Sequence, residues 1–118
     1  MKSYAVVITD EAEMDLQAIF DYIAFELLSP ENADSQLTRI EEAIEMAGVL
    51  PEKYRRYEKE PWHSRNLCLF PVDNYCVFYI PDEAKKTVTI IRVIYGGRDI
   101  DKELNRLSEK STKKKSKK

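Results

Sequence analysis

The fold of this chain is decided by the stretch RNLCLFPVDNYCVFYI, which spans residues 65–80. Two apolar runs in it flank Asp73-Asn74, a pair that is typical of a tight turn between antiparallel strands. Side chains alternate between the two faces of a strand, so this register places Cys68 and Cys76 on opposite faces of the sheet. The stretch therefore predicts a β-hairpin whose two cysteines cannot form a disulfide.

Two amphipathic helices are predicted before this hairpin. Apolar residues recur at helical spacing over residues 12–27 and again over residues 33–47. Asp10 has the form of a capping residue for the first helix, and Ser29-Pro30 is a start signal for the second. Gly48 suits the left-handed position that commonly ends a helix. Because only a few residues join them, the two helices are expected to form an antiparallel helical hairpin.

The remaining elements complete an α+β fold. The expected order is β-α-α-β-β-β(-α), with the helical hairpin packed on a mainly antiparallel sheet. The predicted strands and the short terminal helix cover residues 4–9, 65–72, 75–80, 87–95 and 98–107. Residues 51–64 show no clear period and are interpreted as a long surface loop. We expect one domain over residues 1–107 and a Lys-rich disordered tail over residues 108–118.

Charge is distributed unevenly along the chain. The sequence has 19 basic and 21 acidic residues, and its last ten residues hold six Lys and one Glu. Subtraction leaves 13 basic and 20 acidic residues before that segment, so the body carries a net charge of −7 and the tail +5. Phosphate binding depends on Lys and Arg, so a body this acidic is a poor general binder of nucleic acid.

Other classes of protein are disfavoured by composition. No apolar run approaches the roughly 20 residues that cross a bilayer, and no signal-peptide core is visible, so we expect a cytoplasmic protein with no membrane partner. The spacing of two cysteines and a single histidine matches no metal motif. We therefore expect no metal, no cofactor and no small-molecule substrate.

Both faces of the predicted sheet are apolar, although the chain offers only one layer of helices. Leu67 lies on one face, and Val77 and Tyr79 lie on the other. A partner protein is expected to cover the spare face or groove.

Several strings in this order resemble the RelE/ParE family of toxins. They are Tyr4-x-Val6-x-Ile8-Thr9, Ala12-Glu13-x-Asp15-Leu16, the run from Phe70 to Tyr79, and the run from Ile91 to Asp99. The resemblance covers residues 3–107 and lies closer to ParE-like than to RelE-like members. It implies a growth-inhibiting, plasmid-stabilising toxin of a type II toxin–antitoxin system, neutralised by a cognate antitoxin. An antitoxin helix or strand across the sheet would then contact Leu67, Val77 and Tyr79.

The resemblance leaves two activities open. RelE-like members cleave messenger RNA on the ribosome, which requires groups that activate a 2′-hydroxyl and stabilise charge on a phosphate. The cationic positions of RelE are occupied here by Leu67, Leu69 and Cys76. The catalytic candidates that remain under this hypothesis are Arg92, Tyr95, Arg98, Arg65 and His63. Each has a structural alternative: for Arg92, which lies mid-strand, it is a buried ion pair.

ParE-like members inhibit DNA gyrase and are not known to use a catalytic site. On this interpretation the first helical hairpin holds the target, and the expected target-binding residues are Asp15, Ile19, Tyr22 and Phe25. The missing cations and the acidic body favour gyrase over the ribosome and messenger RNA. A third hypothesis is a degenerate member that only binds a partner.

Overall fold

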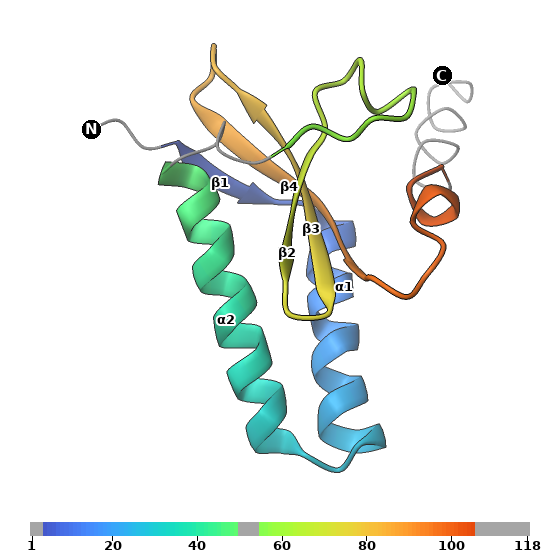
Figure 1. The fold of residues 1–118 in the computed structure, drawn as a ribbon. Helices are drawn as coiled ribbons and strands as arrows, with labels where there is room; N and C mark the ends of the chain where they lie inside the picture. The colour runs from blue at the N-terminus through green and yellow to red at the C-terminus, as the bar shows by residue number, and fades with distance from the viewer. Residues whose placement is uncertain (1–3, 50–54, 106–118) are drawn as a thin grey trace, which may run out of the picture.

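A four-stranded sheet forms the centre of the computed structural model, which describes residues 4–49 and 55–105 (Figure 1). The strand order is β1-β4-β3-β2, with β1 parallel to β4 and the other neighbours antiparallel. The strands span Ala5–Ile8 (β1), Cys68–Val72 (β2), Tyr75–Asp82 (β3) and Thr87–Tyr95 (β4). The predicted α+β fold with a mainly antiparallel sheet is confirmed.

The β2–β3 hairpin has the predicted register. Val72 pairs with Tyr75, and Cys68 pairs with Tyr79. Asp73, in the turn, has a φ of 55°, as the mirror-image turns of hairpins require. Cys68 and Cys76 form no disulfide with each other and pack in different clusters on opposite faces of the sheet. This outcome follows from the period of two in a strand.

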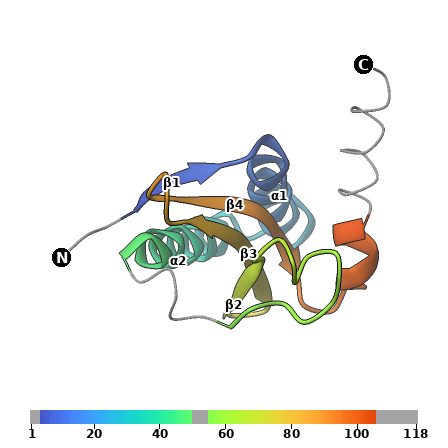
Figure 2. The same cartoon turned by 90° about the horizontal axis from the view of Figure 1, so that it is seen from above.

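The helical hairpin covers one face of the sheet, as the view from above shows (Figure 2). It consists of α1 (Asp10–Asp21), a π-helical turn η1 (Tyr22–Glu26) and α2 (Pro30–Val49). The cap of α1 is Thr9 rather than Asp10, because the Thr9 hydroxyl accepts a hydrogen bond from the backbone N–H of Ala12 at 3.2 Å. That hydroxyl also donates to the carbonyl of Ile90 at 2.9 Å, so one side chain joins the cap to β4.

Gly48 serves close packing and does not terminate α2 in a left-handed conformation. None of the described glycines has a positive φ, and α2 continues to Val49. A Cβ at Gly48 would lie 2.9 Å from the Tyr4 carbonyl oxygen and 3.0 Å from a methyl group of Val6. The backbone N–H of Tyr4 donates to the Gly48 carbonyl at 2.8 Å. A glycine is needed because β1 and the end of α2 touch backbone to backbone.

Two clusters of buried side chains stabilise the two faces of the sheet. The first lies between the helices and the sheet and includes Ile40, Ile44, Val77 and Tyr79. The second lies on the opposite face, where the loop over residues 57–66 and a helical turn at residues 100–105 cover the strands. Trp62 and Leu104 are 5% and 0% exposed in this second cluster.

The second cluster corrects two expectations. Residues 51–64 were expected to form a long surface loop, and the spare face of the sheet was expected to be covered by a partner. Instead the chain covers much of that face itself: Tyr57 packs edge-on against Phe78 with ring centroids 5.9 Å apart. The predicted tail, residues 108–118, lies outside the described residues. In the described part, no helix is long and apolar enough to cross a membrane.

Candidate functional site

Arg92 in β4 forms a two-pronged ion pair with Asp15 of α1. Its Nε lies 2.6 Å from Asp15 Oδ2 and its Nη2 lies 2.8 Å from Asp15 Oδ1. Both side chains are largely buried, with 14% and 16% of their surface exposed. Asp15 Oδ2 also accepts the backbone N–H of Val93 at 3.0 Å. The sequence allowed two roles for Arg92, in a functional site or in a structural ion pair. The structure places it in an ion pair.

Glu103, in the terminal helical turn, lies on the other side of the same guanidinium. Arg92 Nη2 is 3.6 Å from Glu103 Oε1, and Arg98 Nη1 is 3.9 Å from Glu103 Oε2. The hydrogen bond to Asp15, above all, raises the pKa of Arg92 above its usual value. Two carboxylates therefore neutralise this arginine and join α1, β4 and the terminal turn.

A β-bulge determines where Arg92 points. Phe78 pairs with Arg92 while the next residue of β3, Tyr79, pairs with Ile90, so Ile91 is extra. Strict alternation along β4 would place Ile91 and Val93 on the same face. Instead Ile91 packs against the second cluster and Val93 belongs to the first. The bulge interrupts the alternation next to the ion pair.

Tyr95 ends β4 in an exposed group of tyrosines. Its ring meets that of Tyr75 at 5.8 Å and 64°, and 51% of Tyr95 is exposed. Burial, followed by the nearby Tyr95 and Tyr22, raises the pKa of Tyr75. A phenol with a raised pKa is a poor proton acceptor at neutral pH, so Tyr75 is better suited to contact than to acid–base chemistry.

His63 and Arg65 lie in the loop that covers the second cluster. His63 Nδ1 is 3.7 Å from a carboxylate oxygen of Glu60, and the Arg65 guanidinium lies 4.9 Å from the centre of the Trp62 ring. These contacts are local to the loop. Among the described residues, neither side chain forms a hydrogen bond, ion pair or ring contact with Arg92, Tyr95 or Arg98.

The five catalytic candidates therefore do not form one constellation. Arg92 and Arg98 share a carboxylate, Tyr95 packs edge-on against another tyrosine, and the contacts of His63 and Arg65 lie within the loop. Within residues 4–49 and 55–105, no group of three or more His, Cys, Asp or Glu is arranged to hold a metal ion. A cationic centre for phosphate chemistry is not assembled among these five side chains.

Four exposed large apolar side chains cluster at the turn between α1 and α2. Tyr22, Phe25, Leu27 and Leu28 are 55%, 67%, 56% and 82% exposed. Leu28 adopts a φ of 53°, which is unusual for a bulky residue. The π-helical turn η1 immediately precedes it, and such turns recur at functional sites. We call these four residues the hairpin tip.

The four target-binding candidates differ in their accessibility to solvent. Tyr22 and Phe25 belong to the hairpin tip and are accessible. Ile19 is partly buried against the helical core, and Asp15 is engaged by Arg92. Sequence patterning assigned Leu27 to the apolar stripe of the first helix, and it named neither Leu27 nor Leu28 as a contact for the target. A bulky residue next to the Ser29-Pro30 helix start was the only available signal.

The three antitoxin-binding candidates are inaccessible in this structure. Leu67, Val77 and Tyr79 are each 0% exposed. Val77 and Tyr79 face the helices, whereas Leu67 lies under the loop that holds Trp62. The open surface that the sequence suggested for them is filled by the chain's own segments.

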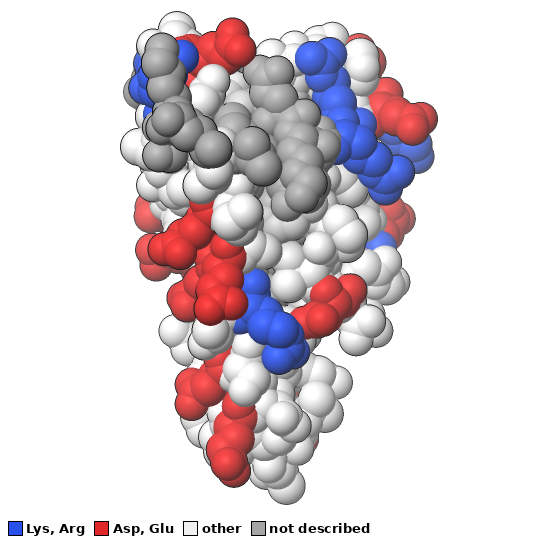
Figure 3. Space-filling model, turned by 60° about the vertical axis from the view of Figure 1, so that its left-hand side comes forward, with Lys and Arg blue, Asp and Glu red and all other residues white. Residues whose placement is uncertain are grey.

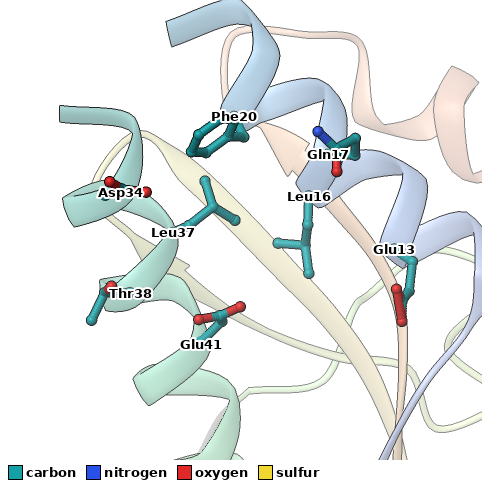
Figure 4. Close-up of a pocket in the computed structure, with 8 residues that line it drawn as sticks. All are labelled: Glu13, Leu16, Gln17, Phe20, Asp34, Leu37, Thr38 and Glu41. Atoms are coloured by element: carbon teal, nitrogen blue, oxygen red, sulfur yellow. The ribbon is translucent and has the colours of Figure 1, made fainter. Parts of the chain in front are cut away.

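A groove lies between α1 and α2 on the outer side of the helical hairpin (Figure 4). Leu16 and Phe20 of α1 and Leu37 of α2 form its apolar floor. Exposed polar side chains complete the lining, and they are Glu13, Gln17, Asp34, Thr38 and Glu41. We call these eight residues the interhelical groove.

Comparisons with known proteins agree with this architecture. The model of the ParE toxin of the type II toxin–antitoxin system parDE matches residues 6–100. This chain belongs to the ParE toxin family. A comparison with curated proteins gave no match.

Solved toxin–antitoxin structures share the fold of this ParE-family chain at low identity. A chain of the chromosomal ParDE system from P. aeruginosa has a TM-score of 0.65 and 20% identity, over 79% of this chain and 96% of that one. A chain of the RelBE2 toxin–antitoxin complex from Mycobacterium tuberculosis has a TM-score of 0.57 and 21% identity, over 80% of this chain and 99% of that one. A chain of the archaeal RelE–RelB complex from Pyrococcus horikoshii has a TM-score of 0.54 and 19% identity, over 82% of this chain and 99% of that one.

Proposed function

We propose that this ParE-family toxin inhibits growth by binding DNA gyrase through its hairpin tip, without a catalytic site of its own. The observation that carries the proposal is the state of Arg92. The mid-strand cation that RNA cleavage would use is neutralised by Asp15 and Glu103. In contrast, the hairpin tip exposes apolar side chains that make no comparable internal contacts, a property typical of a protein-binding surface.

We also propose that a cognate antitoxin binds this chain, because the similar structures include toxin–antitoxin complexes. The burial of Leu67, Val77 and Tyr79 constrains how it binds. An antitoxin that reaches Leu67 has to displace the loop at residues 57–66. An antitoxin that leaves this loop in place binds elsewhere on the surface.

Messenger RNA cleavage is the second candidate function. It is favoured by the exposure of two candidate side chains near the end of β4. Tyr95, the last residue of β4, is 51% exposed, and the side chain of Arg98, three residues later, is 63% exposed. Under this hypothesis Arg98→Ala abolishes toxicity, whereas under the gyrase hypothesis it leaves toxicity intact.

The test is pulse-labelling of bacteria in the first minutes after controlled induction of the full chain. Gyrase inhibition lowers thymidine incorporation first, and RNA cleavage lowers methionine incorporation first. The informative variant is Phe25→Ser in the hairpin tip. The matched control is Met46→Ser, which removes another exposed apolar side chain, 49% exposed, near the far end of α2.

We expect an early fall in thymidine incorporation, abolished by Phe25→Ser and retained by Met46→Ser. Phe25 is 67% exposed, so its replacement costs little folding free energy and the variant remains folded. An early fall in methionine incorporation that Arg98→Ala removes would instead establish the RNA-cleavage function. Circular dichroism of each purified variant separates loss of function from loss of fold.

A further inference from the structure

The two helices of the hairpin concentrate most of the acidic charge of the chain. Five Asp and Glu residues lie in α1, one in η1 and five in α2, against a single cation, Arg39. Arg39 is itself engaged, with its Nε 2.7 Å from Asp73 Oδ2. Figure 3, which brings forward the side that lies to the left in Figure 1, shows acidic side chains running down this face of the molecule.

The interhelical groove combines this charge with an apolar floor, in which Phe20 and Leu37 are partly exposed. Leu16 and Leu37 face each other across it, and Glu13, Asp34 and Glu41 are exposed along its sides (Figure 4). A ligand suited to this lining has cations at short intervals on flexible aliphatic stems. Lysine has this form, because its methylene groups can lie on apolar surface while the ammonium group remains in water.

The chain itself contains such a segment. Residues 109–118 hold six Lys and one Glu. Glu103, two residues before the last described residue, lies beside the Arg92 guanidinium that also binds Asp15 of α1. The described chain therefore ends close to α1. Thirteen residues separate Asn105 from Lys118, and an extended chain of that length reaches about 43 Å. The smallest dimension of the molecule is 26 Å, so this reach is sufficient to bring the lysines to the groove.

We propose that the Lys-rich segment, residues 109–118, docks in cis on the interhelical groove, with its ammonium groups against Glu13, Asp34 and Glu41. Attachment through a short linker keeps its local concentration in the millimolar range, so weak exposed ion pairs suffice for occupancy. This proposal is independent of which target the toxin inhibits.

Carbodiimide cross-linking of the full chain at low micromolar concentration tests the proposal. The reagent joins a lysine amine directly to a carboxylate in contact with it, and peptide mass spectrometry identifies each pair. We expect tail lysines to link to Glu13, Asp34 and Glu41 several-fold more often than to Glu58 and Glu83, which are also exposed. The preference should disappear in 1 M NaCl, where the screening length falls from about 10 Å at 0.1 M to about 3 Å.

A second measurement does not depend on the cross-linking reagent. Lys113→Gln, Lys114→Gln and Lys115→Gln together should shift the backbone amide resonances of Gln17 and Thr38 in the groove. The matched control replaces the same three lysines by arginine, retains the charge and should leave those resonances nearly in place. Links spread evenly over all exposed carboxylates, together with unchanged groove resonances, would overturn the proposal. Links found only between two chains would show that a second copy occupies the groove instead.

Discussion

Asp15 and Arg92 form a structural ion pair, although the sequence suggested a separate functional role for each. The sequence suggested Arg92 as a catalytic cation and Asp15 as a contact for the target. The structure uses both to hold α1 against β4, with distances of 2.6 and 2.8 Å and little exposure to solvent. Loss of toxicity in a variant of either residue would therefore report on folding before it reported on function.

We expect Asp15→Ala to lower the free energy of unfolding by about 3 kcal/mol, because it leaves a largely buried guanidinium without its principal partner. Urea unfolding at pH 7 measures the loss. Arg39→Ala is the control, since the Arg39–Asp73 pair is exposed, at 52% and 41%, and its loss should cost far less. Equal costs for the two variants would refute the structural role of the buried pair.

Asp101 provides a prediction for the pH dependence of stability. Hydrogen bonds from Lys59 and Tyr57 lower the pKa of Asp101 below its usual value. A carboxylate with a depressed pKa stabilises the folded state above its unfolded pKa of about 3.9, and this contribution is lost as the pH falls through the lower folded value. Asp101→Asn should therefore unfold more easily than the unmodified chain at pH 7, and the two should converge as the pH falls below about 3.9 and through the lower folded pKa of Asp101.

Thermal melts at a series of pH values measure this convergence. Glu83→Gln in the exposed β3–β4 turn makes the same change in net charge and is the control. A constant difference between Asp101→Asn and the unmodified chain down to pH 2 would contradict the assigned role of these hydrogen bonds.

At the scale of elements, the α1–α2 connection departs most from what periodicity predicts. Apolar spacing indicated one helix over residues 12–27, but α1 ends at Asp21 and a π-helical turn follows. Leu28 then enters the left-handed region with a φ of 53° and 82% exposure. Nothing in its surroundings compensates this conformation by burial, so its retention is consistent with the proposed contact with a target.

Leu28→Gly should raise the free energy of unfolding by up to about 1 kcal/mol, because glycine adopts positive φ without the penalty that leucine incurs there. Leu27→Gly is the control, since Leu27 has a φ of −92° and gains no such relief. If the hairpin tip binds the target, Leu28→Gly should also be less toxic while more stable. A variant that is both less stable and fully toxic would contradict both expectations.

At the scale of the whole molecule, the sheet is enclosed on both faces by one chain. The helices cover one face, and the loop at residues 57–66 together with the turn at residues 100–105 covers the other. Tyr57 and Lys59 hold this turn through Asp101, and Glu103 joins it to Arg92. The segment that precedes the Lys-rich tail is therefore part of the folded core.

Leu104→Ala should lower the free energy of unfolding by about 2–4 kcal/mol, because Leu104 is 0% exposed and its truncation leaves a cavity among Trp62, Phe78 and Ile94. Lys102→Ala, on the exposed side of the same turn, is the control. Urea unfolding followed by Trp62 fluorescence reports on this cluster. A cost near that of Lys102→Ala would mean that the turn contributes little to the core.

The sequence alone determined the order of the elements, the register of the β2–β3 hairpin and the opposite orientation of Cys68 and Cys76. These features follow from periods of 2 and 3.6 residues and from turn chemistry, which act over a few neighbouring residues. The family could also be anticipated from strings of this kind.

Only the tertiary structure decided the partners of the candidate site. Asp15 and Arg92 lie 77 positions apart, and a bulge beside Ile91 aims the arginine, so no local period encodes their pairing. The burial of Leu67 beneath Trp62 likewise depends on a loop without a regular pattern. The sequence around Gly48 predicted only a helix end. The Tyr4 carbonyl oxygen, which leaves no room for a side chain at Gly48, lies there because the start of β1 packs against the end of α2. Contacts between distant segments are set by how the layers pack, and the sequence pattern specifies only which faces are available to pack.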